Sequence, residues 1–187
     1  MAEPFPEVFG NPDQAVVSTD GRWIAASVCW HGHSRVAVYR AADLSLAHLL
    51  EYTEEAEPIA FHPVLPLLAV GLDNGDEYFR AGGLTLLEAD TGHRVDFTDP
   101  GRGIDLVRWL DPRTLELTFC AVDTHNEYVY YVSRPTVVRD DWRGLAPDAL
   151  DLPALDGPLL DEVTYPDTGS ARELLRSLAE QAGRPYR

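Results

Sequence analysis

A His-x-His pair in a glycine-containing turn is the arrangement in this sequence with the most obvious chemical potential. His31 and His33 flank Gly32, and carboxylates are abundant in the segments nearby. Imidazole nitrogens and carboxylate oxygens together bind zinc and related transition metals. The pattern therefore keeps a metal-dependent hydrolase open as an alternative. A short turn of this kind is more often a polar loop that faces solvent and binds no ion, so we expect no metal here.

An Asp-Asn-Gly-Asp-Glu run at residues 73–77 offers a second group of oxygen ligands. Calcium favours such oxygens, but the spacing of an EF-hand loop and its distal bidentate glutamate are missing. Asn-Gly is also a strong signal for a turn between two strands. We predict a hairpin turn at this position and no calcium site.

Motifs for nucleophilic or nucleotide chemistry do not occur in the sequence. There is no Gly-x-Ser-x-Gly elbow, no phosphate-binding Gly-x-x-x-x-Gly-Lys loop and no dinucleotide fingerprint. The chain contains no lysine, which excludes Schiff-base and lysine general-base chemistry. No carboxylate pair stands out as an acid and a base. We predict that the protein is not an enzyme and uses no cofactor.

The elements that must position these side chains form three similar blocks, each with two apolar runs around a turn. Equivalent residues in the second runs are Trp23, Leu67 and Leu115, which are 44 and 48 positions apart. Repeats of about 40 to 50 residues with several strands each are typical of propeller blades. We therefore predict an all-β fold of three antiparallel, propeller-like blades that form an incomplete propeller. An ordinary β-sandwich is the alternative.

Four strands are expected in each block. Unbroken apolar runs indicate burial on both faces, whereas alternation from Leu115 to Ala121 indicates a half-buried strand. The leucines of residues 44–52 would also suit a helical turn. The expected strands are residues 15–18, 23–30, 35–40 and 44–52; then 59–61, 67–72, 83–88 and 94–97; then 105–109, 115–122, 128–133 and 136–139.

The second block resembles a WD-repeat-type propeller blade. The similarity lies in residues 60–63 (Ala-Phe-His-Pro), 67–71 and 83–92, and residues 18–25 are similar to the start of another blade. The repeats are degenerate, since the Trp-Asp dipeptide and the Gly-His pair of that family do not occupy their usual places. The resemblance covers about residues 15–139. It implies a propeller-like fold, a binding or scaffolding role, and a structural role for His62.

Beyond the repeats, the composition changes. We predict a repeat domain over residues 1–139 and a Pro-, Asp- and Leu-rich tail over residues 140–187, ending in a helix at about 170–182. Ser170 and Glu173 form a capping box ahead of an apolar stripe, and Gly183 ends the helix. Three blades do not close a ring and leave apolar faces open. The tail, a partner protein or a second copy completing a six-bladed ring could cover them.

The charge of the chain is strongly negative, with 31 acidic residues against 15 basic ones and a net charge of −16. Such a charge opposes binding to phosphate backbones, so we expect no nucleic-acid partner.

No leader or bilayer-spanning apolar run is apparent, which predicts a soluble, cytoplasmic protein without a membrane partner. All 15 basic residues are arginines, as in many GC-rich bacterial genomes. Cys29 and Cys120 are expected to be free thiols.

In a four-stranded blade, the loop after the second strand and the loop to the next blade lie at the same end of the sheet. Acidic and histidine side chains gather in these loops, and we call this end of the sheets the acidic rim. Its negative charge would attract a basic partner. We predict a non-catalytic interaction or scaffold module that presents this rim to another protein. An immunity or inhibitor-type protein that neutralises a basic enzyme is an alternative, as is a rim that serves solubility alone. The expected partner-binding residues are His31, His33, Glu54, Glu55, Glu57, Asp73, Asp76, Asp123 and His125.

Overall fold

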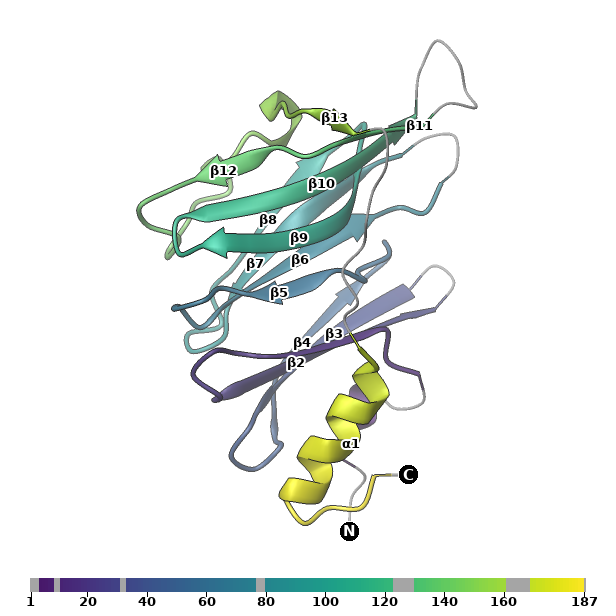
Figure 1. Cartoon of the computed structure of the whole chain (residues 1–187), viewed down its shortest axis with the longest axis vertical. Helices are drawn as coiled ribbons and strands as arrows, with labels where there is room; N and C mark the ends of the chain where they lie inside the picture. The colour runs from purple at the N-terminus through teal and green to yellow at the C-terminus, as the bar shows by residue number, and fades with distance from the viewer. Residues whose placement is uncertain are drawn as a thin grey trace.

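Three antiparallel β-sheets, stacked one on the next, make up most of the protein (Figure 1). The computed structural model describes residues 4–8, 11–30, 33–76, 80–122, 130–160 and 169–186. The first sheet contains β1 (Gln14–Val17), β2 (Trp23–Trp30), β3 (His33–Arg40) and β4 (Leu46–Tyr52), and the second contains β5 (Ile59–Phe61), β6 (Leu67–Asp73), β7 (Gly82–Glu88) and β8 (Arg94–Asp99). In both sheets the spatial order follows the sequence. The all-β prediction is confirmed, with three stacked sheets in place of the sandwich alternative.

The third sheet departs from the predicted strand order. It contains β9 (Gly103–Asp111), β10 (Thr114–Val122), β11 (Tyr130–Ser133), β12 (Thr136–Val138) and β13 (Leu159–Leu160). Both β11 and β12 pair with the same edge of β10, and Ser133 lies opposite Phe119 just as Val137 lies opposite Leu115. These pairs share one register, so β11 and β12 are two parts of a single strand.

The strand predicted at residues 136–139 is present as β12, but its predicted place as the fourth strand of the sheet is wrong, and the cause is Pro135. Proline has no backbone N–H, which removes one ladder hydrogen bond and divides the strand. Its carbonyl still accepts the N–H of Leu117 at 3.0 Å, so the chain stays on the edge of β10. β13, from the tail, takes the fourth place by pairing with β11.

The turns follow their predicted chemistry where the structure describes them. Gly21 has φ 71° and Gly92 has φ 78°, in the left-handed region that glycine adopts without strain. Leu44 also has a positive φ, 58°, and its side chain is buried. This conformation ends the β3–β4 turn, so that β4 begins at Leu46 and the segment is a strand instead of a helical turn.

Two apolar cores lie between the sheets, and the second sheet contributes to both. Leu68, Val70 and Leu87 face the first sheet, whereas Leu67, Leu84 and Phe97 face the third. The alternation of side chains along a strand sends neighbouring residues to opposite faces. Because both faces are covered, β6 is buried along its whole length.

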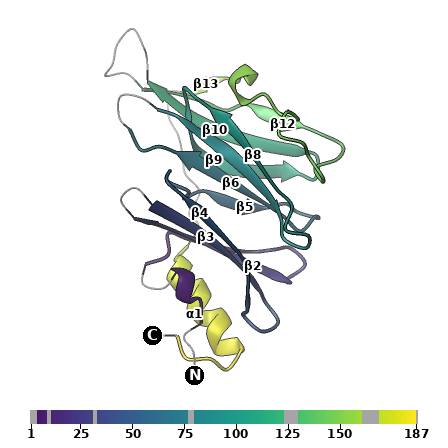
Figure 2. The same ribbon diagram turned by 180° about the vertical axis from the view of Figure 1, so that it is seen from behind.

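A third core covers the outer face of the first sheet. Helix α1 (Ala171–Gln181) and the 3₁₀ helix η1 (Pro6–Val8) pack there, and Figure 2 shows them at the end of the stack. The predicted capping is present, since the Glu173 N–H donates to Ser170 Oγ at 3.2 Å. Leu175 is fully buried against the sheet. The tail therefore covers one end of the stack.

The segment before α1 is attached to the second and third sheets. The Arg102 guanidinium donates to the backbone carbonyls of Leu152 and Leu155 at 2.6 and 2.9 Å, beside the 3₁₀ helix η2 (Leu152–Ala154). Trp142 packs edge-on against Trp109, with ring centroids 4.9 Å apart. These contacts bury Trp142 and extend the core between the sheets.

His62 links two neighbouring turns, as its predicted structural role requires. Its Nδ1 accepts the N–H groups of Val64 and Leu65, and its Nε2 lies 2.8 Å from the Pro112 carbonyl. This pattern needs the neutral ring with the proton on Nε2. Burial accordingly lowers the pKa of His62.

Among the described residues, no helix has the length and apolar composition needed to cross a lipid bilayer.

Replacing Leu175 with alanine tests the covering role of α1. The substitution leaves a cavity in a fully buried site, and we expect the free energy of unfolding to fall by about 2–4 kcal/mol. Urea unfolding followed by circular dichroism measures this change. Arg176→Ala, on the exposed face of the same helix, should change it by less than about 0.5 kcal/mol. Equal effects of the two substitutions would mean that the helix does not pack on the sheet in solution.

Candidate functional site

The loop between the first two sheets joins the end of β6 through a short backbone bridge. The Glu55 N–H donates to the Asp73 carbonyl at 2.6 Å, and the Asp73 N–H donates back to the Glu55 carbonyl at 2.9 Å. Gly75 approaches closely, because an added Cβ would lie 2.8 Å from Glu55 Oε1. Two of the predicted rim residues are therefore direct neighbours.

A buried ion cluster lies next to this bridge. Asp73 is buried; its Oδ1 accepts the Gly75 N–H at 3.0 Å and its Oδ2 pairs with the Arg80 guanidinium. Arg80 Nη1 also lies 3.5 Å from Asp105 Oδ1, on the third sheet. Gly103 leaves space for this cluster, since a Cβ there would come within 2.3 Å of the Asp73 carboxylate carbon. Arg80 thus balances a buried charge and links two sheets.

Three carboxylates, one from each repeat, come together beside the ion cluster. Asp13 precedes β1, Glu57 precedes β5 and Asp105 lies near the start of β9. Their spacings in the chain are 44 and 48 residues, the same intervals that relate the second strands of the three sheets. The first strands β1, β5 and β9 lie side by side, which brings these positions together. We call Asp13, Glu57 and Asp105 the acidic triad.

The triad residues affect one another electrostatically. Partial burial raises the pKa of Glu57, and repulsion from Asp13, Glu55 and Asp105 raises it further. Burial also raises the pKa of Asp13, against the opposing effect of the hydrogen bond that its carboxylate accepts from the Cys29 N–H. The charged forms of both groups are therefore disfavoured in this cluster.

A cavity of about 410 Å³ lies on the same rim, beside the start of β3 and the end of β4. The Arg94 guanidinium lies over the Tyr52 ring, 5.1 Å from its centroid. Glu51 pairs with Arg35 at 3.1 Å. The cavity brings together two predicted residues, His33 and Glu54; its lining is His33, Glu51, Tyr52, Thr53, Glu54 and Arg94.

Of the remaining residues predicted to lie on the rim, the structure describes one and leaves three undescribed. Asp76 is exposed on the loop after β6. His31, Asp123 and His125 lie outside the described residues, so their roles stay predictions. In the part of the chain that the structure describes, no group of three or more His, Cys, Asp or Glu residues is arranged to hold a metal ion.

Both cysteines are unpaired thiols, and neither has the character of a nucleophile. Burial raises the pKa of Cys120 to about 11, with further increases from Asp105 and Asp73 and a decrease from Arg80. Burial likewise raises the pKa of Cys29. A thiol with a raised pKa is protonated at neutral pH and reacts slowly.

Two residues of the acidic triad lie outside the set of predicted site residues. Asp13 precedes the first predicted strand, and Asp105 begins another predicted strand. A signal for both is present, because Asp13 lies 44 residues before Glu57 and Asp105 lies 48 residues after it. Extending the repeat alignment from the apolar runs to the charged residues would have identified both.

Comparison with known proteins gives no family. No protein-family model matches the chain, and no curated protein matches it. A solved structure described as the eukaryotic initiation factor is similar over 67% of this chain and 30% of its own, at 8% identity and a TM-score of 0.46. Oligopeptidase B from Trypanosoma brucei, with covalently bound antipain in a closed form, is similar over 79% of this chain and 20% of its own, at 17% identity and a TM-score of 0.42. The chain spans less than a third of either structure.

Replacing Glu57 with glutamine tests the repulsion within the acidic triad. The pKa of Glu57 is raised above its usual 4.5, so its contribution to stability is greatest below that pH and is lost as the pH rises through the raised pKa. We expect Glu57→Gln to increase the urea midpoint slightly at about pH 7.5, with little change at about pH 4.

Glu180→Gln, on an exposed position of α1, is the control for the loss of one negative charge. Urea is the suitable denaturant because it limits aggregation near the isoelectric point of about 4.5. An equal increase for both variants at about pH 7.5 would attribute the effect to net charge and contradict a local repulsion.

Proposed function

We propose that this protein is a non-catalytic interaction module of the incomplete-propeller type, whose acidic rim binds a basic segment of a partner protein. The acidic triad is the observation that carries this proposal. Among the described residues, Asp13 and Glu57 have no ion-pair partner, and burial together with repulsion from Asp13 and the other nearby carboxylates raises the pKa of Glu57. A guanidinium or ammonium group from a partner would neutralise part of this negative charge. The attraction between opposite charges would then stabilise the complex.

The arrangement of the sheets supports the propeller interpretation. In a propeller, the first strand of each blade lies closest to the axis, and here β1, β5 and β9 are neighbours. Side chains at one end of these strands then surround the opening of the central channel. The acidic triad occupies that place, where the charges of Asp13 and Glu57 would act together on one bound group while Asp105 lies 3.5 Å from Arg80 Nη1.

The cavity beside β3 and β4 extends the proposed surface. Glu54 supplies a carboxylate there, whereas Glu51 already pairs with Arg35 and the Arg94 guanidinium already lies over the Tyr52 ring. An arginine or lysine of a partner that enters this cavity would therefore meet Glu54. The proposed partner segment therefore carries at least two basic residues, one for the triad and one for this cavity.

A separate protein is a better partner for the rim than a second copy of this chain. A head-to-tail ring of two chains needs the outer face of the first sheet as an interface. Helix α1 and η1 occupy that face and bury Ala171, Leu175 and Ala179 on it. Closing the ring would require the helix to leave an apolar site.

A charge-matched comparison tests the rim. The combined substitutions Glu54→Gln, Glu55→Gln and Glu57→Gln should weaken binding of an octa-arginine peptide at least about fivefold at about 20 mM salt, because they remove carboxylates at the binding site. Fluorescence anisotropy with a labelled peptide measures the affinity. The melting temperature should stay nearly unchanged or rise slightly.

The matched control is Asp148→Asn, Asp151→Asn and Glu180→Gln, which removes the same number of charges from exposed positions away from the rim. Its effect on the affinity should be less than about twofold. Equal weakening by both sets would show that the peptide responds to net charge alone and would contradict a binding role for the rim.

Light scattering on the purified protein tests the choice of partner. We expect a mass of 20.7 kDa, that of one chain, at every concentration. A dimer that persists on dilution would contradict a separate partner and favour two chains that complete one ring.

A further inference from the structure

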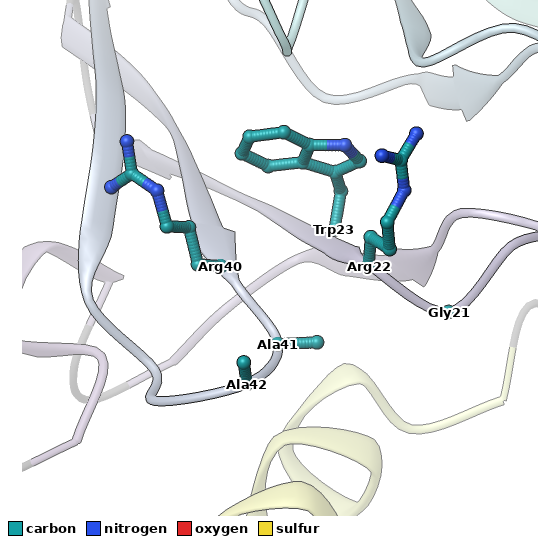
Figure 3. Close-up of a pocket in the computed structure, with 6 residues that line it drawn as sticks. All are labelled: Gly21, Arg22, Trp23, Arg40, Ala41 and Ala42. Carbon is teal, nitrogen blue, oxygen red and sulfur yellow. The ribbon is translucent and has the colours of Figure 1, made fainter.

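We propose that a pocket at the opposite end of the first sheet binds the carboxylate of an aromatic or branched apolar acid. The pocket has a volume of about 440 Å³ and is formed by the β1–β2 turn and the β3–β4 turn. Figure 3 shows its six lining residues, Gly21, Arg22, Trp23, Arg40, Ala41 and Ala42. These turns lie at the end of the strands away from the acidic rim, so the proposal is independent of the function proposed above.

Small residues keep this pocket open. Gly21 has φ 71°, and a Cβ added to it would meet no atom within 4 Å. Ala41 and Ala42 form the facing turn, and larger side chains there would fill the space. Backbone pairing holds the two turns together, since the Ala41 N–H donates to the Arg22 carbonyl at 2.9 Å.

Two arginines supply positive charge at the pocket. Arg22 is oriented by Asp20, whose Oδ2 accepts the Arg22 Nε–H at 2.6 Å. This bond uses the Nε–H and leaves the terminal amino groups to contact a ligand. The hydrogen bonds from the Arg22 N–H, the Ser18 hydroxyl and the Arg22 side chain lower the pKa of Asp20 to about 2, so Asp20 remains charged and holds Arg22 over a wide pH range.

Arg40 is the more informative of the two arginines. It forms no ion pair with any described residue, in a chain that has 31 acidic residues for 15 arginines. Its neighbour Asp43 accepts the N–H and hydroxyl of Ser45 at Oδ1, at 2.9 and 2.6 Å, and forms only a longer-range electrostatic interaction with Arg40. The Arg40 guanidinium instead lies by the Trp23 ring, 6.0 Å from its centroid, and remains exposed to the pocket.

Trp23 gives the pocket an apolar wall. It lies directly across the strand pair from Arg40, and the residue is 8% exposed. Its Nε1 is buried and has no hydrogen-bond acceptor among the described residues. In Figure 3 the side chains of Arg22 and Arg40 extend to either side of the indole. An apolar ligand body packed on Trp23 would therefore have a guanidinium on each side.

The chemistry of this arrangement favours a carboxylate over other groups. Arginine binds carboxylates through paired, charge-assisted hydrogen bonds, and an indole face packs well against aromatic or branched groups. A cation is disfavoured by the two arginines. The acid has two sources, a free small molecule or the C-terminal residue of a polypeptide, and both present the same carboxylate and apolar body.

N-acetyl-phenylalanine and its neutral amide form the test pair of ligands. Binding is followed by the ¹H–¹⁵N signal of the Trp23 indole, assigned by its loss in Trp23→Phe. We expect the acid to bind with a dissociation constant in the millimolar range or below, and the amide to bind at least about tenfold more weakly. Arg40→Gln should weaken binding of the acid by a similar factor.

Two further variants test whether the ligand binds in this pocket or responds only to the overall charge of the protein. Ala42→Phe fills the cavity without changing charge and should abolish binding, whereas Arg113→Gln removes an exposed arginine at another turn and should leave binding unchanged. Equal affinity for acid and amide, binding that survives both Arg40→Gln and Ala42→Phe, or the absence of binding at about 20 mM ligand would overturn the proposal.

Longer peptides distinguish the two sources of the acid. A tetrapeptide ending in phenylalanine with a free carboxylate, compared with the same peptide ending in an amide, tests the C-terminal form. Binding of the free-acid tetrapeptide at least as tight as that of N-acetyl-phenylalanine supports a polypeptide terminus. Binding of N-acetyl-phenylalanine without binding of the tetrapeptide supports a small acid.

Discussion

The structure depends on covering both faces of the middle sheet. β6 is buried from Leu67 to Asp73, and its alternating side chains enter two different cores. Burial of this much apolar surface is the main driving force available to a chain of this size. The first and third sheets cover the two faces of the middle one, and α1 and η1 cover the outer face of the first sheet.

The same constraint explains why charge collects at the strand ends. Where stacked sheets bury their faces, polar side chains must lie at edges and in loops. Asp13, Glu57 and Asp105 occupy such positions in successive repeats, and repetition of the fold places them together. Asp73 lies deeper and requires Arg80 as a partner, because an unpaired buried carboxylate is costly.

The sequence predicted the elements whose signals lie in repetition along the chain or in a short motif. The intervals between Trp23, Leu67 and Leu115 predicted three similar sheets, and the capping box at Ser170 predicted α1. The third sheet was harder, because the effect of Pro135 depends on what lies opposite it: the Leu117 N–H keeps the interrupted strand in place. The pocket at Trp23 could not be predicted, since Arg40 meets Trp23 through cross-strand register, which residue spacing alone does not reveal.

The position of β13 has a consequence for the order of folding. Its two residues complete the third sheet from a point about twenty residues beyond β12, and α1 covers the outer face of the first sheet from still farther along the chain. A chain emerging from the ribosome therefore exposes the outer face of the first sheet until α1 has been made. Contacts of such long sequence separation form late and slowly. We expect nascent chains to require protection from aggregation during this interval. The high negative charge of the sequence would supply part of that protection, because like-charged chains repel one another.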